Sequence, residues 1–323
     1  MKTENVTIIG LDRISGSIGL GIQATDLELT ITGSDQDKDI SAQAKEMGVV
    51  NKLNSNPVKA AAEADILILN VPLAEHERMI EAIAPVVQDH TLIVDLSRLK
   101  GPGLKFASQY LVQGHYVGVI PVLGAKTLTD GRFGIEAAQA DLFKQSLFCI
   151  MPSPKADTKA VETTVNLGRI LGASPFFIDS MEYDSLVQGL ETAPGLLAAA
   201  MFRAVRNSSG WRDMLKFAGL QFSLSTGSLE TPDLVDLAYH DKVATLHWLD
   251  EVINELREVR TWIADGDKER ATLLLDELAH EREMWLSERQ RNDWNEIESA
   301  DYSRTGVMSQ LFGFRTGKKD KKK

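Results

Sequence analysis

The pattern at residues 5–19 constrains the fold of this chain more than any other feature. An apolar stretch at residues 5–9 runs into Gly10, and a helix-forming segment rich in small residues follows. A buried strand, a tight glycine turn and a helix start, in this order, form the phosphate-gripping element of a dinucleotide-binding domain. The sequence therefore predicts such a domain at the start of the chain.

The glycine fingerprint of that element is altered. The usual G-x-G-x-x-G reads here as Gly10, Asp12 and Ser15 at its three glycine positions. The second glycine normally lets the backbone approach the pyrophosphate, and Asp12 puts a side chain and a negative charge there instead. The strand-turn-helix signal is strong, whereas the signal for a bound dinucleotide is weakened. The predicted cofactor contacts in this segment are Gly10, Leu11, Ile14, Gly16 and Ser17.

Further cofactor contacts are predicted after the next two strands. Asp35 lies roughly 20 positions past the glycine turn, where an acidic residue hydrogen-bonds a ribose hydroxyl and repels a 2′-phosphate. NAD is therefore favoured over NADP, although a polar residue that merely ends a strand is an equal alternative. Val71 and Pro72 end the apolar run at residues 64–73 and complete the predicted set.

Apolar runs alternate with helical patterns through the first 180 residues. This alternation is typical of an α/β fold with an open, mostly parallel sheet of the Rossmann type. Continuous apolar strands suit a sheet covered on both faces. The predicted strands lie at residues 27–32, 64–73, 91–95, 115–121, 146–151 and 174–178, and a helix lies at 157–171.

After about residue 180 the pattern becomes purely helical. Helices are predicted at 181–204, 230–264 and 268–297. We therefore divide the chain into a dinucleotide-binding domain (1–180), an all-helical substrate and dimerisation domain (181–299) and a basic tail (300–323). The helical domain is expected to close over the sheet and supply a dimer contact, since tryptophans at 248, 262, 285 and 294 favour burial or an interface. The alternative is a long exposed hairpin of helices.

Composition narrows the partners and the location. The net charge is −11, which argues against nucleic acid as the main partner. The apolar segments are too short to span a bilayer, and the N-terminus enters a strand directly, so a cytoplasmic location is expected. The lone Cys149 indicates a buried thiol, and no Cys/His spacing suits a metal. The basic tail is expected to be a solubilising end or, alternatively, an electrostatic tether to an anionic surface or RNA.

Several segments together resemble the prephenate/arogenate dehydrogenases of tyrosine biosynthesis over residues 5–265. Residues 9–19 resemble that family's I-G-x-G-x-I-G-G-S-x-G, and residues 95–100 its D-x-G-S-x-K. Residues 120–124 resemble H-P-M-A-G, residues 182–184 match E-H-D, and residues 210–218 resemble G-F-R-D-x-T-R-I-A. The resemblance implies a homodimeric, NAD-dependent oxidoreductase that takes hydride from a carboxylate-bearing, cyclohexadienol-like substrate.

The departures from the family pattern fall on its chemistry. The histidine that takes the hydroxyl proton corresponds to Ile120, which cannot accept a proton. The serine that supports it corresponds to Arg98, and the carboxylate-binding arginine corresponds to Lys216, whereas Lys100 is unchanged. The resemblance assigns catalytic positions to Arg98 and Lys100, and Arg212 and Lys216 would bind a small anionic carboxylate ligand.

Two other side chains are candidates for a replacement proton acceptor. His240 lies on a helix that borders the family's cleft, and it completes the predicted catalytic set. Tyr183 replaces a family histidine and is a second candidate. His76, His90 and His280 stand in polar contexts and are predicted to be surface residues.

Two functions of different classes follow from these residues. In the first, the chain is an active NAD-dependent oxidoreductase with a relocated base. In the second, it is a catalytically inactive relative that acts as a dimeric ligand-sensing or partner-binding protein. A β-hydroxyacid dehydrogenase is a weaker third interpretation, because residues 182–202 lack the lysine which that class carries there.

Overall fold

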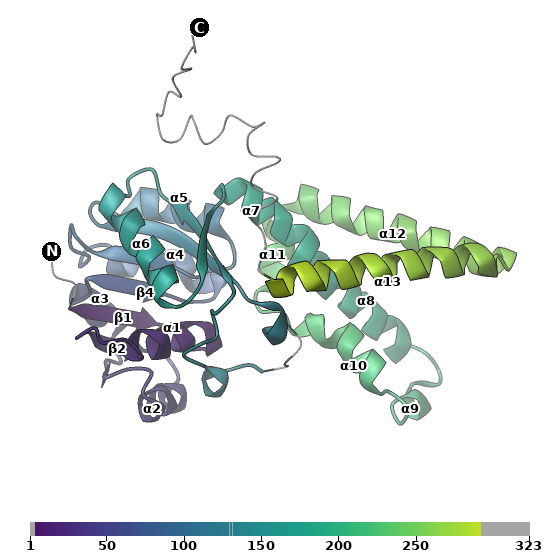
Figure 1. The fold of residues 1–323 in the computed structure, drawn as a ribbon, viewed down its shortest axis with the longest axis horizontal. Coiled ribbons are helices and arrows are strands. Elements are labelled where there is room, and N and C mark those ends of the chain that lie inside the picture. Colours follow the sequence, from purple (N-terminus) through teal and green to yellow (C-terminus); the bar gives the residue numbers. More distant parts are fainter. Residues whose placement is uncertain (1–3, 129, 131, 292–323) are drawn as a thin grey trace, which may run out of the picture.

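The computed structural model describes residues 4–128, 130 and 132–291. The N-terminal part of the chain forms an open eight-stranded sheet, with helices around it (Figure 1). The strand order is β3-β2-β1-β4-β5-β6-β7-β8, and every neighbouring pair is parallel except β6 with β7. The strands are β1 (Asn5–Ile9), β2 (Thr30–Ser34), β3 (Lys52–Leu53), β4 (Ile66–Leu69), β5 (Leu92–Asp95), β6 (His115–Val122), β7 (Leu147–Pro152) and β8 (Ser174–Phe177). The predicted mostly parallel α/β sheet is confirmed.

Helices connect the strands and then form a separate layer (Figure 1). Those within the sheet domain are α1 (Arg13–Gln23), α2 (Lys38–Glu46), α3 (Pro57–Ala62), α4 (Leu73–Ile83), α5 (Lys100–Tyr110), η1 (Ala125–Thr127), η2 (Ile135–Ala137) and α6 (Thr158–Ile170). Those after it are α7 (Ser180–Val187), η3 (Gln188–Thr192), α8 (Ala193–Arg206), α9 (Trp211–Met214), α10 (Leu220–Thr226), η4 (Gly227–Glu230), α11 (Leu234–His240), α12 (Lys242–Asp265) and α13 (Lys268–Arg291).

Both faces of the central strands of the sheet are buried. Successive residues of a strand point to opposite faces, so a strand covered on both sides is apolar throughout. In β4, Ile66 and Ile68 join a core cluster with α1 and α6, whereas Leu67 and Leu69 join a second cluster with α4 and α5. This explains why β4 reads as a continuous apolar run.

The altered glycine turn still joins β1 to α1 tightly. Gly10 has φ +83°, and a Cβ atom there would lie 1.8 Å from the carbonyl oxygen of Asn70. Only glycine fits such a position, because it combines a left-handed backbone with close backbone contact. Asp12 then begins α1 as its N-cap, so the turn keeps its shape despite the substitution.

The helical part begins with an almost unbroken run in place of the single predicted helix at 181–204. Between α7 and α8 the chain forms the short π-helix η3, and α8 starts with Pro194 in its first turn. Proline lacks an N–H and is tolerated there, whereas it would break a longer helix at its centre. Within the described residues, no helix is both long and apolar enough to cross a membrane.

The last two helices form an antiparallel hairpin. In Figure 1, α12 and α13 run side by side and extend away from the sheet. Only the end of α13 returns to the sheet domain, where Arg289 donates to the carbonyl oxygen of Leu123. Trp262 is buried where the hairpin turns, whereas Trp248 and Trp285 remain partly exposed. The predicted residues 292–299 of this domain, with Trp294, and the tail lie outside the described residues.

Helix caps join the two domains. The helix α5 has no capping side chain of its own, and its first two amides, of Lys100 and Gly101, donate to the carboxylate of Asp184 at 2.7 and 2.8 Å. Asp184 belongs to α7, in the helical domain. A capping carboxylate satisfies amides that a helix leaves free and interacts favourably with the helix dipole. The contact between the two domains at this point is therefore made by hydrogen bonds to a charged side chain.

Candidate functional site

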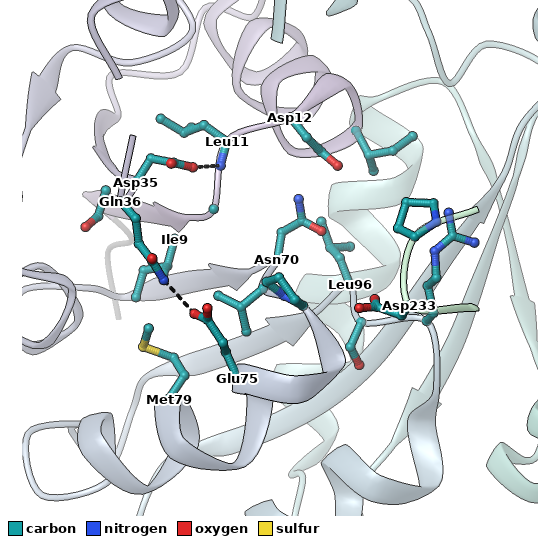
Figure 2. A pocket seen from close by; sticks show the side chains of 18 of the residues that line it. Ile9, Leu11, Asp12, Asp35, Gln36, Asn70, Glu75, Met79, Leu96 and Asp233 are labelled. Atoms are coloured by element: carbon teal, nitrogen blue, oxygen red, sulfur yellow. Dashed lines mark hydrogen bonds between the residues drawn. The ribbon is translucent and has the colours of Figure 1, made fainter. Parts of the chain in front are cut away.

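A cavity of about 620 Å³ lies between the sheet and the helical domain, at the carboxyl ends of β1, β4, β5 and β6. Open parallel sheets bind their ligands at this edge, next to the point where the strand order reverses. Figure 2 shows side chains from both sides of the glycine turn and from the helical domain around it. It is lined by Ile9, Gly10, Leu11, Asp12, Ile14, Ser34, Asp35, Gln36, Asp37, Ser55, Pro57, Asn70, Val71, Pro72, Glu75, Met79, Leu96, Ser97, Arg98, Ile120, Pro121, Leu123, Tyr183, Glu191, Pro232 and Asp233.

Most of the predicted cofactor residues come together here. Those that line the cavity are Gly10, Leu11, Ile14, Asp35, Val71 and Pro72. Gly16 and Ser17 lie behind the turn instead. A Cβ atom on Gly16 would meet the side chain of Ile135 at 2.4 Å, and the Ser17 hydroxyl accepts the amide of Gln139. These two residues therefore hold α1 against the following loop.

The Asp12 side chain lies at the N-terminus of α1, where the diphosphate of a dinucleotide would bind. Its Oδ1 accepts the Ser15 amide at 2.8 Å, and the Ser15 hydroxyl accepts the Asp12 amide at 3.0 Å. A helix N-terminus is a ready anion site, and here the chain supplies its own anion. The turn and the cavity fit a dinucleotide, whereas the Asp12 carboxylate weakens the hold on its phosphates.

The ribose end of the cavity is strongly acidic. Asp35 Oδ2 accepts the Leu11 amide at 2.7 Å, and its other oxygen accepts the Asp37 amide at 2.8 Å. Gln36 donates to Glu75 across the cavity, as Figure 2 shows. Asp35, Asp37 and Glu75 thus place three carboxylates at this end of the cavity.

The opposite end holds Arg98 and Ile120, the positions that the family resemblance assigns to a serine and a histidine. Arg98 follows β5 and Ile120 belongs to β6, the strand paired with it, and both residues line the cavity. Arg98 forms an ion pair with Glu191 from η3. Of the described lining residues, six are carboxylates and Arg98 is the single cation. An anionic ligand must therefore compete with Glu191 for this guanidinium.

A buried cluster of Asp95, Lys100 and His76 lies behind this end of the cavity. Lys100 is fully buried, and its Nζ donates to the carbonyl oxygens of Asp95 (2.8 Å) and Ser97 (2.5 Å). Burial alone would raise the pKa of Asp95, but Lys100 and His76 hold that pKa well below its usual range. Lys100 does not line the cavity; it shapes the segment that carries Ser97 and Arg98.

The surface prediction for His76 is wrong. Its side chain is fully buried, with Nε2 3.2 Å from Asp95 Oδ1. The polar residues around it in the sequence lie on the outer face of α4, and the helical period turns His76 inward. His90 and His280 are exposed, as predicted.

The other predicted catalytic and substrate residues are not brought into the cavity. His240 lies 3.8 Å from Asp184 at the domain joint. Arg212 and Lys216 are exposed, and Lys216 pairs with Asp213. Tyr183 does line the cavity, and burial raises the pKa of its hydroxyl well above 10.0. The described residues hold no group of three or more His, Cys, Asp or Glu side chains suited to a metal.

Asp233 is a lining residue that the sequence did not single out. It precedes α11 with φ +58°, a left-handed conformation that is uncommon for residues other than glycine. Burial raises the pKa of its carboxyl, more than the Leu73 amide and Arg98 lower it. The only sequence signal was the Thr-Pro-Asp turn at residues 231–233, which reads equally well as an ordinary loop.

Comparison with known proteins agrees with this arrangement. Residues 18–174 match the family model described as prephenate dehydrogenase, nucleotide-binding domain, a match that begins just past the altered turn. The prephenate dehydrogenase of Bacillus subtilis is 26% identical over 273 residues, 82% of this chain and 72% of that protein. The probable arogenate/prephenate dehydrogenase of Methanocaldococcus jannaschii is 24% identical over 86% of this chain, which spans only 61% of that relative.

Solved structures show the same fold. The prephenate dehydrogenase from Aquifex aeolicus, in complex with hydroxyphenyl propionate and NAD⁺, has a TM-score of 0.76 at 17% identity and covers 88% of this chain and 99% of its own. The Synechocystis arogenate dehydrogenase has a TM-score of 0.65 at 19% identity. The sequence motifs, the match over residues 18–174 and these relatives agree that this chain is similar to the prephenate/arogenate dehydrogenases.

Proposed function

We propose that this protein is an NAD-dependent oxidoreductase of the prephenate/arogenate dehydrogenase type. Its substrate would be a carboxylate-bearing, cyclohexadienol-like alcohol. The observation that carries the proposal is the cavity itself, which runs from the Gly10 turn at one end to Arg98, Ile120 and Asp233 at the other. A dinucleotide and a small alcohol need such a continuous space between the two domains.

The acidic ribose end supports NAD over NADP. The carboxylate of Asp35 is fixed by two backbone amides, and Asp37 and Glu75 line the same end. A 2′-phosphate would bring about two more negative charges into this group. Repulsion between them favours the cofactor with a free ribose hydroxyl.

The residues at the other end would bind and orient the substrate. A bound oxidised nicotinamide supplies the hydride acceptor. Arg98 is the cation available for a substrate carboxylate, once Glu191 yields it. Ile120, Pro121 and Leu123 form an apolar wall that keeps water from the reacting carbon.

A second candidate function is a ligand-binding relative without turnover, acting as a dimeric sensor or partner-binding protein. Ile120 favours it, since the family's proton acceptor is missing from that position. The ion pair between Glu191 and Arg98 favours it as well, because it neutralises the cation on which an anionic substrate would depend.

Two measurements on the full-length protein separate these functions. Calorimetric titration with NAD⁺ and with NADP⁺ tests the cofactor, and NADH formation with prephenate and with arogenate tests turnover. We expect NAD⁺ to bind more tightly than NADP⁺ and NADH to form with one of the alcohols. Binding of NAD⁺ without turnover of either alcohol would favour the sensor, and no binding of either dinucleotide would reject the oxidoreductase.

A further inference from the structure

Oxidation of an alcohol requires a proton acceptor, and the family position for it holds Ile120. When the C–H bond breaks and hydride leaves, the O–H bond must also break as the C=O bond forms. A positioned base accelerates such a step by about 10²–10⁴-fold. Arg98 stays protonated and cannot accept a proton, and the raised pKa of Tyr183 keeps its hydroxyl protonated at neutral pH.

Asp233 lines the same cavity as Arg98 and Ile120. Its carboxylate accepts the amide of Leu73, the first residue of α4, so it reaches from the helical domain to the sheet domain. The preceding strand end supplies Val71 and Pro72 to the cavity wall. Figure 2 shows Asp233 among the residues that line the cavity.

The surroundings of Asp233 suit a carboxylate base. The charged or titratable groups that act on it are Arg98 from the β5 end, Asp236 from α11 and His76 from α4. The left-handed backbone at Asp233 is a conformation that proteins retain where the surrounding structure enforces it, often at functional sites.

We propose that Asp233 is the proton acceptor of this protein, in place of the family histidine; this rests on the proposed oxidoreductase function. The hydroxyl proton of the substrate passes to the Asp233 carboxylate while hydride passes to the oxidised dinucleotide and the carbonyl forms. Asp233 must be ionised to act, so kcat falls as pH drops through its pKa and levels off above it. A carboxylate with a modestly raised pKa serves as a base in other enzymes.

The test compares Asp233→Asn with wild type and with Asp250→Asn, an exposed aspartate of α12 outside the cavity. Asparagine keeps an oxygen for the Leu73 amide but cannot accept the proton. We expect kcat with prephenate or arogenate to fall by about 10²–10⁴-fold, the acid limb of the pH profile to disappear, and NAD⁺ affinity to stay within about twofold. Asp250→Asn should match wild type, and Asp233→Glu should retain part of the activity and the acid limb.

Each outcome decides between the two proposals. Turnover by Asp233→Asn within about threefold of wild type would overturn the role of Asp233 and leave the oxidoreductase standing. If wild type turns over neither alcohol, the oxidoreductase is rejected, and the role of Asp233 falls with it. Titration of the aspartate carboxyl carbons by ¹³C NMR supplies a readout without turnover. A wild-type Asp233 that titrates at or below 3.8 would contradict the proposal even if the asparagine variant failed to fold.

Discussion

Asp12 combines a structural gain with a functional cost. Its carboxylate caps α1 and is one of the two partners of a capping box with Ser15. A cap of this kind stabilises a helix by about 0.5–2 kcal/mol relative to alanine. The same negative charge stands beside the position where a diphosphate would meet the helix N-terminus.

We expect Asp12→Gly to raise NAD⁺ affinity by about fivefold. Two unit charges 4 Å apart interact by about 1 kcal/mol in water, and removal of one relieves that repulsion. Calorimetry measures the affinity, and thermal unfolding measures the loss of the cap, which is a few tenths of a kcal/mol on replacement by glycine. Asp12→Asn, which keeps a capping oxygen without the charge, is the control. Unchanged or weaker affinity in both variants would show that the phosphates avoid this turn.

A histidine at position 120 is not sufficient to rebuild the family chemistry. In an Asp233→Asn background, we expect Ile120→His to leave turnover at the level of the asparagine variant. The Arg98 guanidinium lines the same cavity as position 120, and a nearby positive charge opposes protonation of an imidazole. Steady-state kinetics with prephenate and arogenate check this. Recovery of turnover to within tenfold of wild type would contradict the electrostatic argument.

The cofactor end of the site was predictable at the residue scale, and the substrate end was not. Gly10, Asp35 and Pro72 follow strand ends, and parallel strands bring such positions to one edge. Asp233 and Glu191 come from the helical domain. Their place in the cavity depends on how the two domains meet, which local pattern does not encode.

At the element scale, the first residue of α5, Lys100, is paired with the buried carboxylate of Asp95. The pKa of Asp95 is lowered in the folded protein, so its ionised form stabilises the fold at pH values above the ordinary carboxyl range. That contribution is lost as pH falls toward the folded pKa. Lys100 is its principal partner, and the unfolded chain offers no equivalent.

We therefore expect Lys100→Met to lower the free energy of unfolding by about 3–5 kcal/mol, because it leaves a buried carboxylate without its countercharge. The pKa of Asp95 should rise, so acid unfolding should begin at higher pH than in wild type. Urea unfolding at several pH values measures both effects. Lys105→Met, at an exposed position of the same helix, is the control. An equal loss in the two variants would refute a specific role for the buried pair.

The observed bounds of the strands and helices show which elements the local sequence pattern could predict. The strand predicted at 27–32 is β2 at Thr30–Ser34, and the two-residue β3 was not predicted. A short strand pairs only because its neighbours present an edge, so its own residues carry little signal. The antiparallel pairing of β7 with β6 is also not encoded in the residues of these strands alone. By contrast, α6 at Thr158–Ile170 matches its predicted span closely, because its apolar period and its Asp157 cap are local.

At the scale of the whole molecule, the helical domain leaves a large apolar surface uncovered. Exposed side chains on η3, α10 and α12, and between α9 and α10, are Leu190, Phe217, Leu220, Val243 and Leu246. Exposed apolar side chains that lie together often mark an interaction surface. A second copy of the chain is the partner that the family resemblance implies.

We expect the protein to form a dimer of about twice 35.6 kDa in light-scattering chromatography. Val243→Glu should raise the dimer dissociation constant by about tenfold or more, since it buries an unpaired charge. Val112→Glu is the matched control, as Val112 is 94% exposed on the sheet domain and Val243 is 83% exposed on α12. A wild-type monomer at micromolar concentration would contradict the dimer.

Local sequence patterns were sufficient to predict the sheet domain and the glycine turn, and residue identity alone shows isoleucine at position 120, where the family resemblance places a histidine. Those features depend on local periodicity, backbone sterics and residue identity, all of which can be read along the chain. Only the tertiary structure decided that His76 and Lys100 meet around Asp95, and that Glu191 and Asp233 reach the cavity. The physical reason is that these contacts join residues up to 160 positions apart, such as Leu73 and Asp233, and form when the two domains pack together.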